Sequence, residues 1–205
     1  YRVIKDEATF ITALRTAKLD LLESVRWSHV DELKKSAPKI QWTRRLANGG
    51  QFVALRMDQK PFDDIRVRRA LYHAIDIETI RTKLMNGQSV PTGSLVASPL
   101  ANYNDPQLEA RLPFDLPKAR ALMAEAGYAD GFDVTIDCTN NRYINDEEIC
   151  LALATMWAQI KVKLKVNAQP RSLWFPRMEK FDTSLYLLGW GGAVTDAETT
   201  FTPVM

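Results

Sequence analysis

Cysteine and histidine are scarce in this sequence, with two residues of each kind among 205. Two cysteines are too few for a fold held together by disulfide bonds, and they do not supply the ligands of a structural zinc site. We therefore expect neither a metal centre nor a cofactor. Cys138 and Cys150 are either one disulfide pair or two inert thiols in the core.

Long apolar runs and an excess of one charge are also missing. No run approaches the roughly 18 apolar residues of a membrane-spanning helix, and the first residues lack the pattern of a signal peptide. Acidic and basic residues are interspersed, with a formal net charge of +2. This balance argues against nucleic acid or an anionic membrane as a partner.

The usual enzyme signatures are absent as well. The sequence has no Walker loop, no GxGxxG, no GxSxG and no HExxH. Two pairs of adjacent acids, Asp63-Asp64 and Glu147-Glu148, lie at expected helix starts, where negative charge is favourable. Capping therefore explains them better than acid/base catalysis. We expect a protein that is not an enzyme. The alternative is a hydrolase or transferase with a Cys/His nucleophilic pair, because such partners can meet in space.

The length of the chain fits one large domain or two small ones and is enough to bury a sizeable core. We expect a single α/β lobe over residues 1–205. Tyr1 leads directly into an expected strand and Met205 falls within an unfinished pattern. We therefore interpret the chain as a piece of a longer protein.

Apolar periodicity and capping residues predict strands that alternate with helices. The turn residues 48–50 predict a hairpin between 40–45 and 51–58. Residues 88–113 show no sustained period, which predicts a long connection. The other expected strands are 1–5 and 19–25, and the other expected helices are 6–17, 28–38, 63–75, 76–86, 115–127 and one that begins at Ser172.

The last third of the sequence predicts a parallel unit. A strand at 132–138, a helix at 145–160 and a strand at 162–166 form an expected right-handed βαβ unit. The continuous apolar run 184–190 is typical of a strand in the centre of a sheet. The sequence therefore predicts a mixed, mostly parallel sheet flanked by helices.

A polar segment follows the first strand of this unit, at the carboxyl end where parallel α/β sheets bind ligands. Arg142 offers a planar fork of donors suited to a carboxylate, and Tyr143 offers a ring face and a hydroxyl. Asn140 and Asn141 offer amide hydrogen bonds. A polar turn without function is the alternative, because such turns are common at this position.

The end of the last apolar strand is a second candidate. It reads Gly189-Trp190-Gly191-Gly192. Glycine permits a close approach of the backbone, and tryptophan offers a large amphipathic surface. Packing of the tryptophan is the alternative.

One stretch is far more specific than these patterns. Residues 61–76 read PFDDIRVRRALYHAID, similar to the signature PF-D-VRVRQAL--AIDR of the extracellular solute-binding proteins of peptide, nickel and opine importers, family 5. Further matches follow in family order at residues 1–9, 115–128, 131–132 and 188–190. The sequence resembles this family over essentially its whole length.

The resemblance implies a fold and a function. Members of the family fold into two α/β lobes that close on a ligand, and this chain resembles the second lobe, a periplasmic-binding-protein-like lobe without its partner. It implies the substrate-binding component of an ABC importer, which takes a peptide-like or other small polar solute between its lobes and delivers it to permease subunits in the membrane. The expected protein is a periplasmic or other extracytoplasmic, membrane-associated monomer made with a signal peptide. A sensor or chaperone on the same scaffold is an alternative.

The resemblance also bears on the ligand. In the dipeptide-binding branch an arginine in the loop of the βαβ unit takes the ligand carboxylate, and Arg142 occupies a similar place. The same branch follows its Gly-Trp with an aspartate that pairs with the peptide amine, where this sequence has Ala193. Asp196 is a candidate substitute. We predict a ligand with an anionic group held by Arg142, touched also by Tyr143, Trp190 and Gly191, and not an ordinary dipeptide recognised at its amine.

An export compartment favours oxidation of cysteine. We therefore predict a disulfide between Cys138 and Cys150 that braces the loop carrying Arg142.

Overall fold

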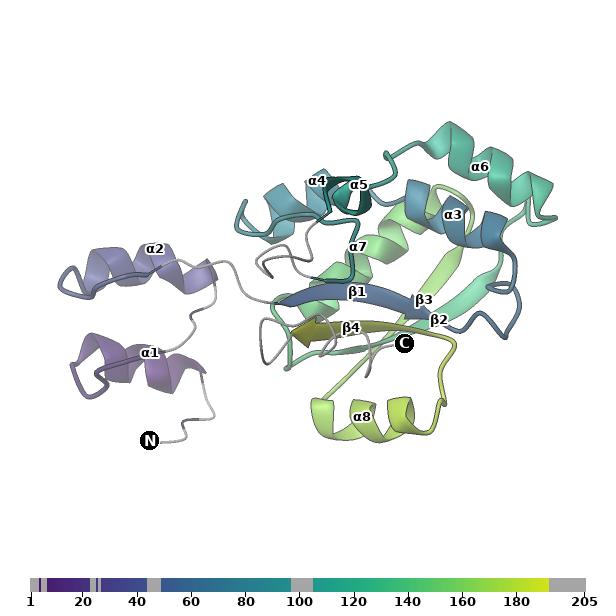
Figure 1. The fold of residues 1–205 in the computed structure, drawn as a ribbon. Helices are drawn as coiled ribbons and strands as arrows, with labels where there is room; N and C mark the ends of the chain where they lie inside the picture. Colours follow the sequence, from purple (N-terminus) through teal and green to yellow (C-terminus); the bar gives the residue numbers. More distant parts are fainter. Residues whose placement is uncertain are drawn as a thin grey trace. The chain divides into compact units, whose positions relative to one another are not determined.

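A four-stranded sheet with helices on both faces forms the centre of the larger part of the chain (Figure 1). The computed structural model describes residues 4, 7–22, 25, 27–43, 49–96 and 105–191. It divides the chain into two compact units, Tyr1–Arg45 and Leu46–Met205. The expectation of one lobe over residues 1–205 stays a prediction, and the sheet lies wholly in the second unit.

The first unit contains two helices, α1 (Glu7–Arg15) and α2 (Trp27–Ser36), near the predicted positions. Arg15 Nη1 lies 3.3 Å from Glu32 Oε1, which joins the two helices by an exposed ion pair. The predicted strand at 19–25 is wrong for its described residues, 19–22 and 25, which form a bend and irregular chain. The predicted strand at 1–5 lies outside the described residues except for residue 4.

The second unit alternates strands and helices as the sequence predicts. Its elements are β1 (Gly49–Leu55), α3 (Ile65–His73), α4 (Ile77–Thr79), the π-helical turn η1 (Ile80–Leu84), α5 (Pro106–Glu109), α6 (Leu116–Glu125), β2 (Asp133–Thr139), α7 (Asp146–Ala158), β3 (Lys163–Gln169), α8 (Arg171–Glu179) and β4 (Leu185–Gly191).

The sheet has the strand order β1-β4-β2-β3. β2 pairs with β3 in parallel and β4 lies inside the sheet, which confirms the predicted βαβ unit, the central strand and the mixed, mostly parallel sheet. The predicted hairpin is wrong, because β1 pairs antiparallel with β4, from Gly49 opposite Gly191 to Leu55 opposite Leu185. Residues 40–43 form no strand. Local turn residues cannot reveal a pairing between segments so far apart in sequence.

The main core lies between the sheet and the helices α3, α6 and α7, which cover one face, whereas α8 covers the other (Figure 1). Side chains alternate along β2, so Ile136 and Cys138 point into this core. Asp64 caps α3 by accepting from the Arg66 amide at 2.8 Å. The side-chain hydrogen bond from Arg66 also holds the pKa of Asp64 below its usual range.

Trp157 links this core to the end of α3. Its indole Nε1 donates to the Leu71 carbonyl at 3.0 Å, in the last turn of the helix, where carbonyls lack intrahelical partners. Trp174 is an internal reference: both indoles are 1% exposed, but Trp174 Nε1 has no hydrogen-bond partner in the described structure.

Replacing Trp157 with phenylalanine should therefore lower the free energy of unfolding more than the same change at Trp174. Both variants lose similar volume, but only the first leaves a buried carbonyl without its partner, which costs about 1–3 kcal/mol. Urea unfolding of the two variants measures the difference. Equal losses would contradict a stabilising role of the Trp157 hydrogen bond.

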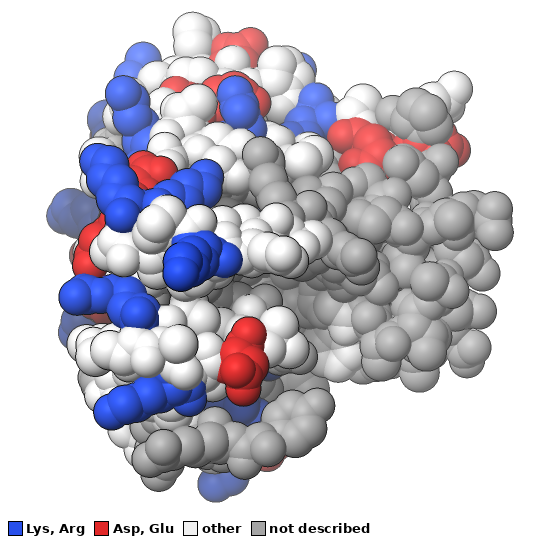
Figure 2. All heavy atoms as spheres, turned by 90° about the vertical axis from the view of Figure 1, so that its left-hand side faces the viewer, with Lys and Arg blue, Asp and Glu red and all other residues white. Residues whose placement is uncertain are grey.

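The surface carries charges of both signs. On the face drawn in Figure 2, Lys and Arg side chains lie at several places with Asp and Glu and uncharged residues between them. This mixture agrees with the interspersed charges of the sequence. Among the residues that the structure describes, no helix is both long and apolar enough to cross a membrane.

Candidate functional site at the carboxyl edge of the sheet

The carboxyl ends of β2, β3 and β4 lie at one edge of the sheet, because these three strands are parallel. The connection after β2 leads to α7 on one face, and the connection after β3 leads to α8 on the other (Figure 1). In α/β proteins, ligands bind at the edge where the connections of neighbouring strands leave toward opposite faces of the sheet. The predicted polar segment, Cys138 to Asn145, lies there. We call residues Thr139 to Asp146 the β2–α7 loop, which includes the last residue of β2 and the first of α7.

Asp146 organises the β2–α7 loop from its buried end. The side chain is 3% exposed. Its Oδ2 accepts from Thr139 Oγ1 at 2.6 Å, from the Arg142 amide at 3.1 Å and from the Tyr143 amide at 3.0 Å. A single carboxylate therefore satisfies two loop amides that have no strand or helix partner.

Other contacts tie the ends of the loop to the scaffold. Gln51 Nε2 of β1 donates to the Ile144 carbonyl at 2.8 Å, and Asn145 Nδ2 donates to the Leu84 carbonyl at 2.6 Å. On the other side, Asn141 Oδ1 accepts from the Arg171 amide at 2.9 Å, and the Asn140 amide donates to the Gln169 carbonyl at 3.1 Å. The loop is thus fastened to β1, η1, β3 and α8.

Tyr143 rests against the end of β4. A Cβ atom placed on Gly189 would lie 2.5 Å from Tyr143 Cε1, so only glycine leaves room for the ring. On the same tyrosine, the Arg142 guanidinium carbon lies 5.2 Å from the ring centroid. This cation–π contact favours one direction of an otherwise exposed side chain.

The structure brings together most of the predicted site residues. Asn140, Asn141 and Arg142 are exposed on the β2–α7 loop, and half-buried Tyr143 joins them to β4. Trp190 is also at this edge, but side chains alternate along β4, so it projects to the face opposite the one that receives Tyr143 at Gly189.

Four further predicted positions have different outcomes. Gly191 is exposed and pairs with Gly49 of β1. Asp196 and Ala193 lie outside the described residues. Asn145, the first residue of the predicted helix 145–160, is at the N-cap position of α7, but it has a left-handed backbone (φ 54°) and makes no side-chain capping bond. Its side-chain amide donates a hydrogen bond to the Leu84 carbonyl instead.

Two residues of the site escape sequence reasoning. Asp146 looks like one more acid at a helix start, and nothing in its pattern shows that it binds the preceding loop. Gln51 is the first residue of the strand 51–58 that was predicted to form a local hairpin, so its contact with Ile144, 93 positions away, has no local signal. A search for acceptors of the loop amides would have favoured Asp146.

The two cysteines are free thiols in the core, so the structure does not contain the predicted disulfide. Both are 0% exposed. A hydrogen bond with Cys138, together with burial, raises the pKa of the Cys150 thiol far above its usual range. This state corresponds to the inert-thiol alternative, because the reactive thiolate is suppressed and solvent is excluded.

We expect both thiols to resist alkylation in the folded protein and to react fully after denaturation without reductant. Burial and the raised pKa of Cys150 explain the first result. Mass spectrometry after iodoacetamide treatment counts the labels. No label before reductant is added would show that the cysteines are bridged, contrary to the structure and in favour of the sequence-based disulfide.

Neither a metal site nor the Cys/His alternative gains support. Within the described ranges no group of three or more His, Cys, Asp and Glu residues is placed to hold a metal ion. His73 is 1% exposed, and its Nδ1 donates to the Pro113 carbonyl at 2.7 Å. The hydrogen bond of Cys150 is with Cys138.

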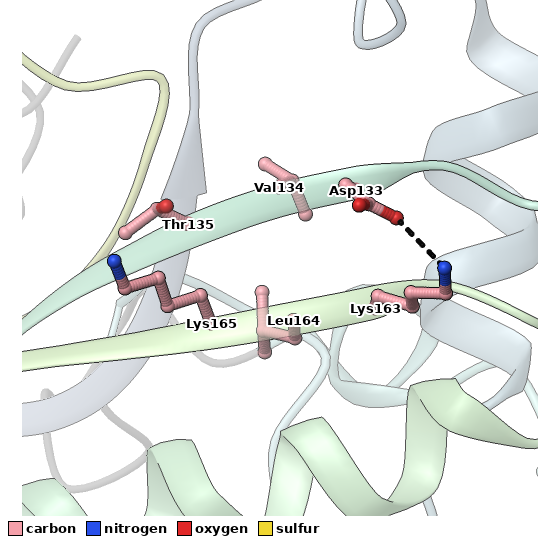
Figure 3. A pocket seen from close by; sticks show the side chains of 6 residues that line it. All are labelled: Asp133, Val134, Thr135, Lys163, Leu164 and Lys165. Carbon is pink, nitrogen blue, oxygen red and sulfur yellow. Dashed lines mark ion pairs between the residues drawn. The ribbon is translucent and has the colours of Figure 1, made fainter.

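A hollow of about 410 Å³ lies over β2 and β3 at the other end of the strands (Figure 3). Its rim carries an exposed ion pair, Asp133 Oδ1 to Lys163 Nζ at 3.8 Å. Exposed ion pairs of this kind contribute little to the stability of the fold. Because it lies at the amino ends of parallel strands, we do not assign the ligand to it. The residues that line it are Asp133, Val134, Thr135, Lys163, Leu164 and Lys165.

Comparison with known proteins matches the whole chain to one family model, "Bacterial extracellular solute-binding proteins, family 5 Middle", over residues 1–205. The chain belongs to this family. The resemblance of residues 61–76 is thereby confirmed, and so is the periplasmic-binding-protein-like fold. In this family 5 chain the 61–76 signature contains the whole of α3 (Ile65–His73) with its flanking residues, and it shares no residue with the β2–α7 loop.

Individual proteins similar to this chain agree with the family match. The glutathione-binding protein GsiB of Salmonella typhimurium is 26% identical over 100% of this chain and 40% of its own length. The dipeptide-binding protein of Pseudoalteromonas sp. SM9913, solved with Met-Leu, superposes with a TM-score of 0.85 at 24% identity, over 99% of this chain and 40% of that one. The PBP AgaA from A. tumefaciens R10, solved with agropinic acid, has a TM-score of 0.81 at 25% identity, over 96% and 39%.

The family 5 chain spans about two fifths of the length of the curated relatives that it matches. The names of these relatives describe binding proteins.

Proposed function

We propose that this chain is one ligand-binding lobe of a solute receptor that serves an ABC importer. The solute lies at the carboxyl edge of the sheet, between this lobe and a second one that the chain does not contain. Closure of the two lobes presents the loaded receptor to permease subunits in the membrane. The receptor is a periplasmic or other extracytoplasmic monomer and has no catalytic activity.

One observation carries the proposal: hydrogen bonds hold the β2–α7 loop at the edge where such sheets bind ligands, and the loop exposes Arg142 next to Tyr143. The loop amides are fixed by Asp146, and the ring of Tyr143 is fixed by Gly189. A polar turn without function needs neither a buried carboxylate that binds its amides nor a glycine that leaves room for a tyrosine ring. The arrangement therefore favours a binding site over the bland alternative.

The ligand carries an anionic group that Arg142 binds. An exposed guanidinium backed by an aromatic ring is suited to a carboxylate, which it can contact with two parallel hydrogen bonds. Ala193 offers no acceptor to an ammonium group, and an ammonium without a partner in a closed cleft is strongly disfavoured. An ordinary dipeptide recognised at its amine is therefore excluded from the proposed ligand class.

Titration calorimetry tests the proposal with the solutes named for the relatives: glutathione, Met-Leu and agropinic acid. The full-length protein should bind an anionic solute of this kind other than Met-Leu, whereas residues 1–205 alone should bind it only at millimolar concentration or not at all. Two lobes share the contacts, so one lobe retains only part of the binding free energy.

Two results would count against the proposal. Sub-micromolar binding by residues 1–205 alone would place the whole site in this lobe. Tight binding of Met-Leu would contradict the exclusion of ordinary dipeptides. The enzyme alternative predicts turnover of the bound solute and rapid alkylation of a cysteine in the folded protein, and the buried thiols argue against it.

A further inference from the structure

The β2–α7 loop is held in two different ways along its length. Its ends are tied to the scaffold, through Asn140 and Asn141 on one side and through Ile144 and Asn145 on the other. Its tip, Arg142 and Tyr143, has both backbone amides bound to Asp146.

We propose that Asp146 is the positioning residue of the ligand site: its buried carboxylate sets the backbone of Arg142 and Tyr143 in the binding conformation before ligand arrives. The inference rests on the proposed function, in which these two side chains contact the solute. Asp146 itself is 3% exposed and takes no part in contacting the solute.

A carboxylate is the side chain suited to this task. Oδ2 accepts from three donors at once, Thr139 Oγ1 and the two tip amides, and Oδ1 accepts from the Glu147 amide at 3.1 Å. An ionised acceptor makes stronger bonds than a neutral one, and the amino end of α7 favours negative charge. Burying an amide without an acceptor costs free energy. Removing the carboxylate therefore takes away the interaction that stabilises this conformation of the tip.

The consequence concerns affinity. A loop that is already in its bound conformation loses less conformational entropy when the solute binds. Without Asp146, Arg142 remains in the sequence and keeps its charge, but its position is no longer fixed. Asp146 thus affects how tightly Arg142 binds the solute, without contacting the solute itself.

Asp137 provides a matched control. It lies on β2 and, like Asp146, is 3% exposed, and its carboxylate accepts from three side chains, Asn167 Nδ2, Arg177 Nη1 and Thr183 Oγ1, each at 2.6 Å. These contacts hold the α8 side of the sheet. Asp137→Ala therefore removes an equally buried acid without releasing the tip of the β2–α7 loop.

Hydrogen exchange on the full-length protein without ligand tests the positioning role directly. Asp146→Ala should accelerate exchange of the Arg142 and Tyr143 amides by about tenfold or more, while β3 stays protected, because only the loop opens. Asp146→Asn, which keeps an oxygen acceptor, should restore much of the protection. Asp137→Ala should leave the two amides unchanged. Unchanged exchange in Asp146→Ala, or equal acceleration in the whole lobe, would overturn the inference.

Affinity for the same three solutes, glutathione, Met-Leu and agropinic acid, separates this inference from the proposed function. For a solute that binds the native protein, Asp146→Ala should weaken binding by about tenfold or more, and Asp146→Asn and Asp137→Ala by less than about threefold. Faster loop exchange with native affinity would refute a ligand site at the tip and the inference with it. If none of the three solutes binds the native protein, the proposed ligand class fails, and the exchange experiment still decides whether Asp146 holds the tip.

Discussion

Replacing Arg142 with alanine should weaken binding of an anionic solute by the full-length protein by about ten- to a hundredfold, equivalent to about 1.5–3 kcal/mol. The guanidinium is exposed at the carboxyl edge and supported by the Tyr143 ring, so its removal takes away a charge-assisted contact without disturbing the core. Arg142→Lys should recover only part of the affinity, because an ammonium cannot make the same planar, two-bond contact.

Arg66→Ala is the control for this prediction. Arg66 is another partly exposed arginine, but it lies in α3 and binds Asp64 and the Glu125 carbonyl. Its loss should leave the affinity at the native value. Calorimetric titration of the three variants measures the effect. Native affinity in Arg142→Ala would show that the anionic group is bound elsewhere.

Replacing Gly189 with alanine should displace Tyr143 and weaken binding by a comparable amount. The added Cβ would lie 2.5 Å from Cε1 and 2.6 Å from Cδ1 of the tyrosine, so the ring must leave its seat on β4. Overpacking of this kind costs about 1–3 kcal/mol, and the displaced ring no longer supports Arg142. Calorimetry and thermal unfolding of the full-length variant measure both effects.

Two further variants make this prediction specific. Gly50→Ala adds a methyl group to β1 where nothing lies within 4 Å of the new Cβ, so it should leave affinity and stability nearly unchanged. The double variant Gly189→Ala with Tyr143→Ala removes the clash, and it should be no less stable than Tyr143→Ala alone. Independent, additive losses in the two single variants would contradict the contact between ring and strand.

Local signals made much of the second unit predictable. Asp64, Asp76 and Asp115 each precede an apolar helical pattern. Each side chain accepts a hydrogen bond from a backbone amide at the start of the predicted helix. The βαβ unit was predictable because β2, α7 and β3 follow each other directly in the chain. The partner of β1 was not, since its antiparallel pairing with β4 joins residues such as Gly49 and Gly191.

The same distinction applies to the candidate site. The position of Arg142 and Tyr143 after a strand was enough to predict a loop at the carboxyl edge. The supports of that loop come from outside the local pattern, because Gln51 belongs to β1 and Gly189 to β4. The alternation along β4 could have shown that Trp190 faces away from Gly189, but the face that receives Tyr143 is fixed only by the tertiary structure.

The most direct test of the account is the footprint of a bound solute on the full-length protein, mapped by hydrogen exchange with and without saturating ligand. The solute should add protection to the β2–α7 loop, residues 139–146, and to the end of β4. Protection at the amino ends of β2 and β3, around Asp133 and Lys163, with no change in the loop, would contradict the assignment of the site.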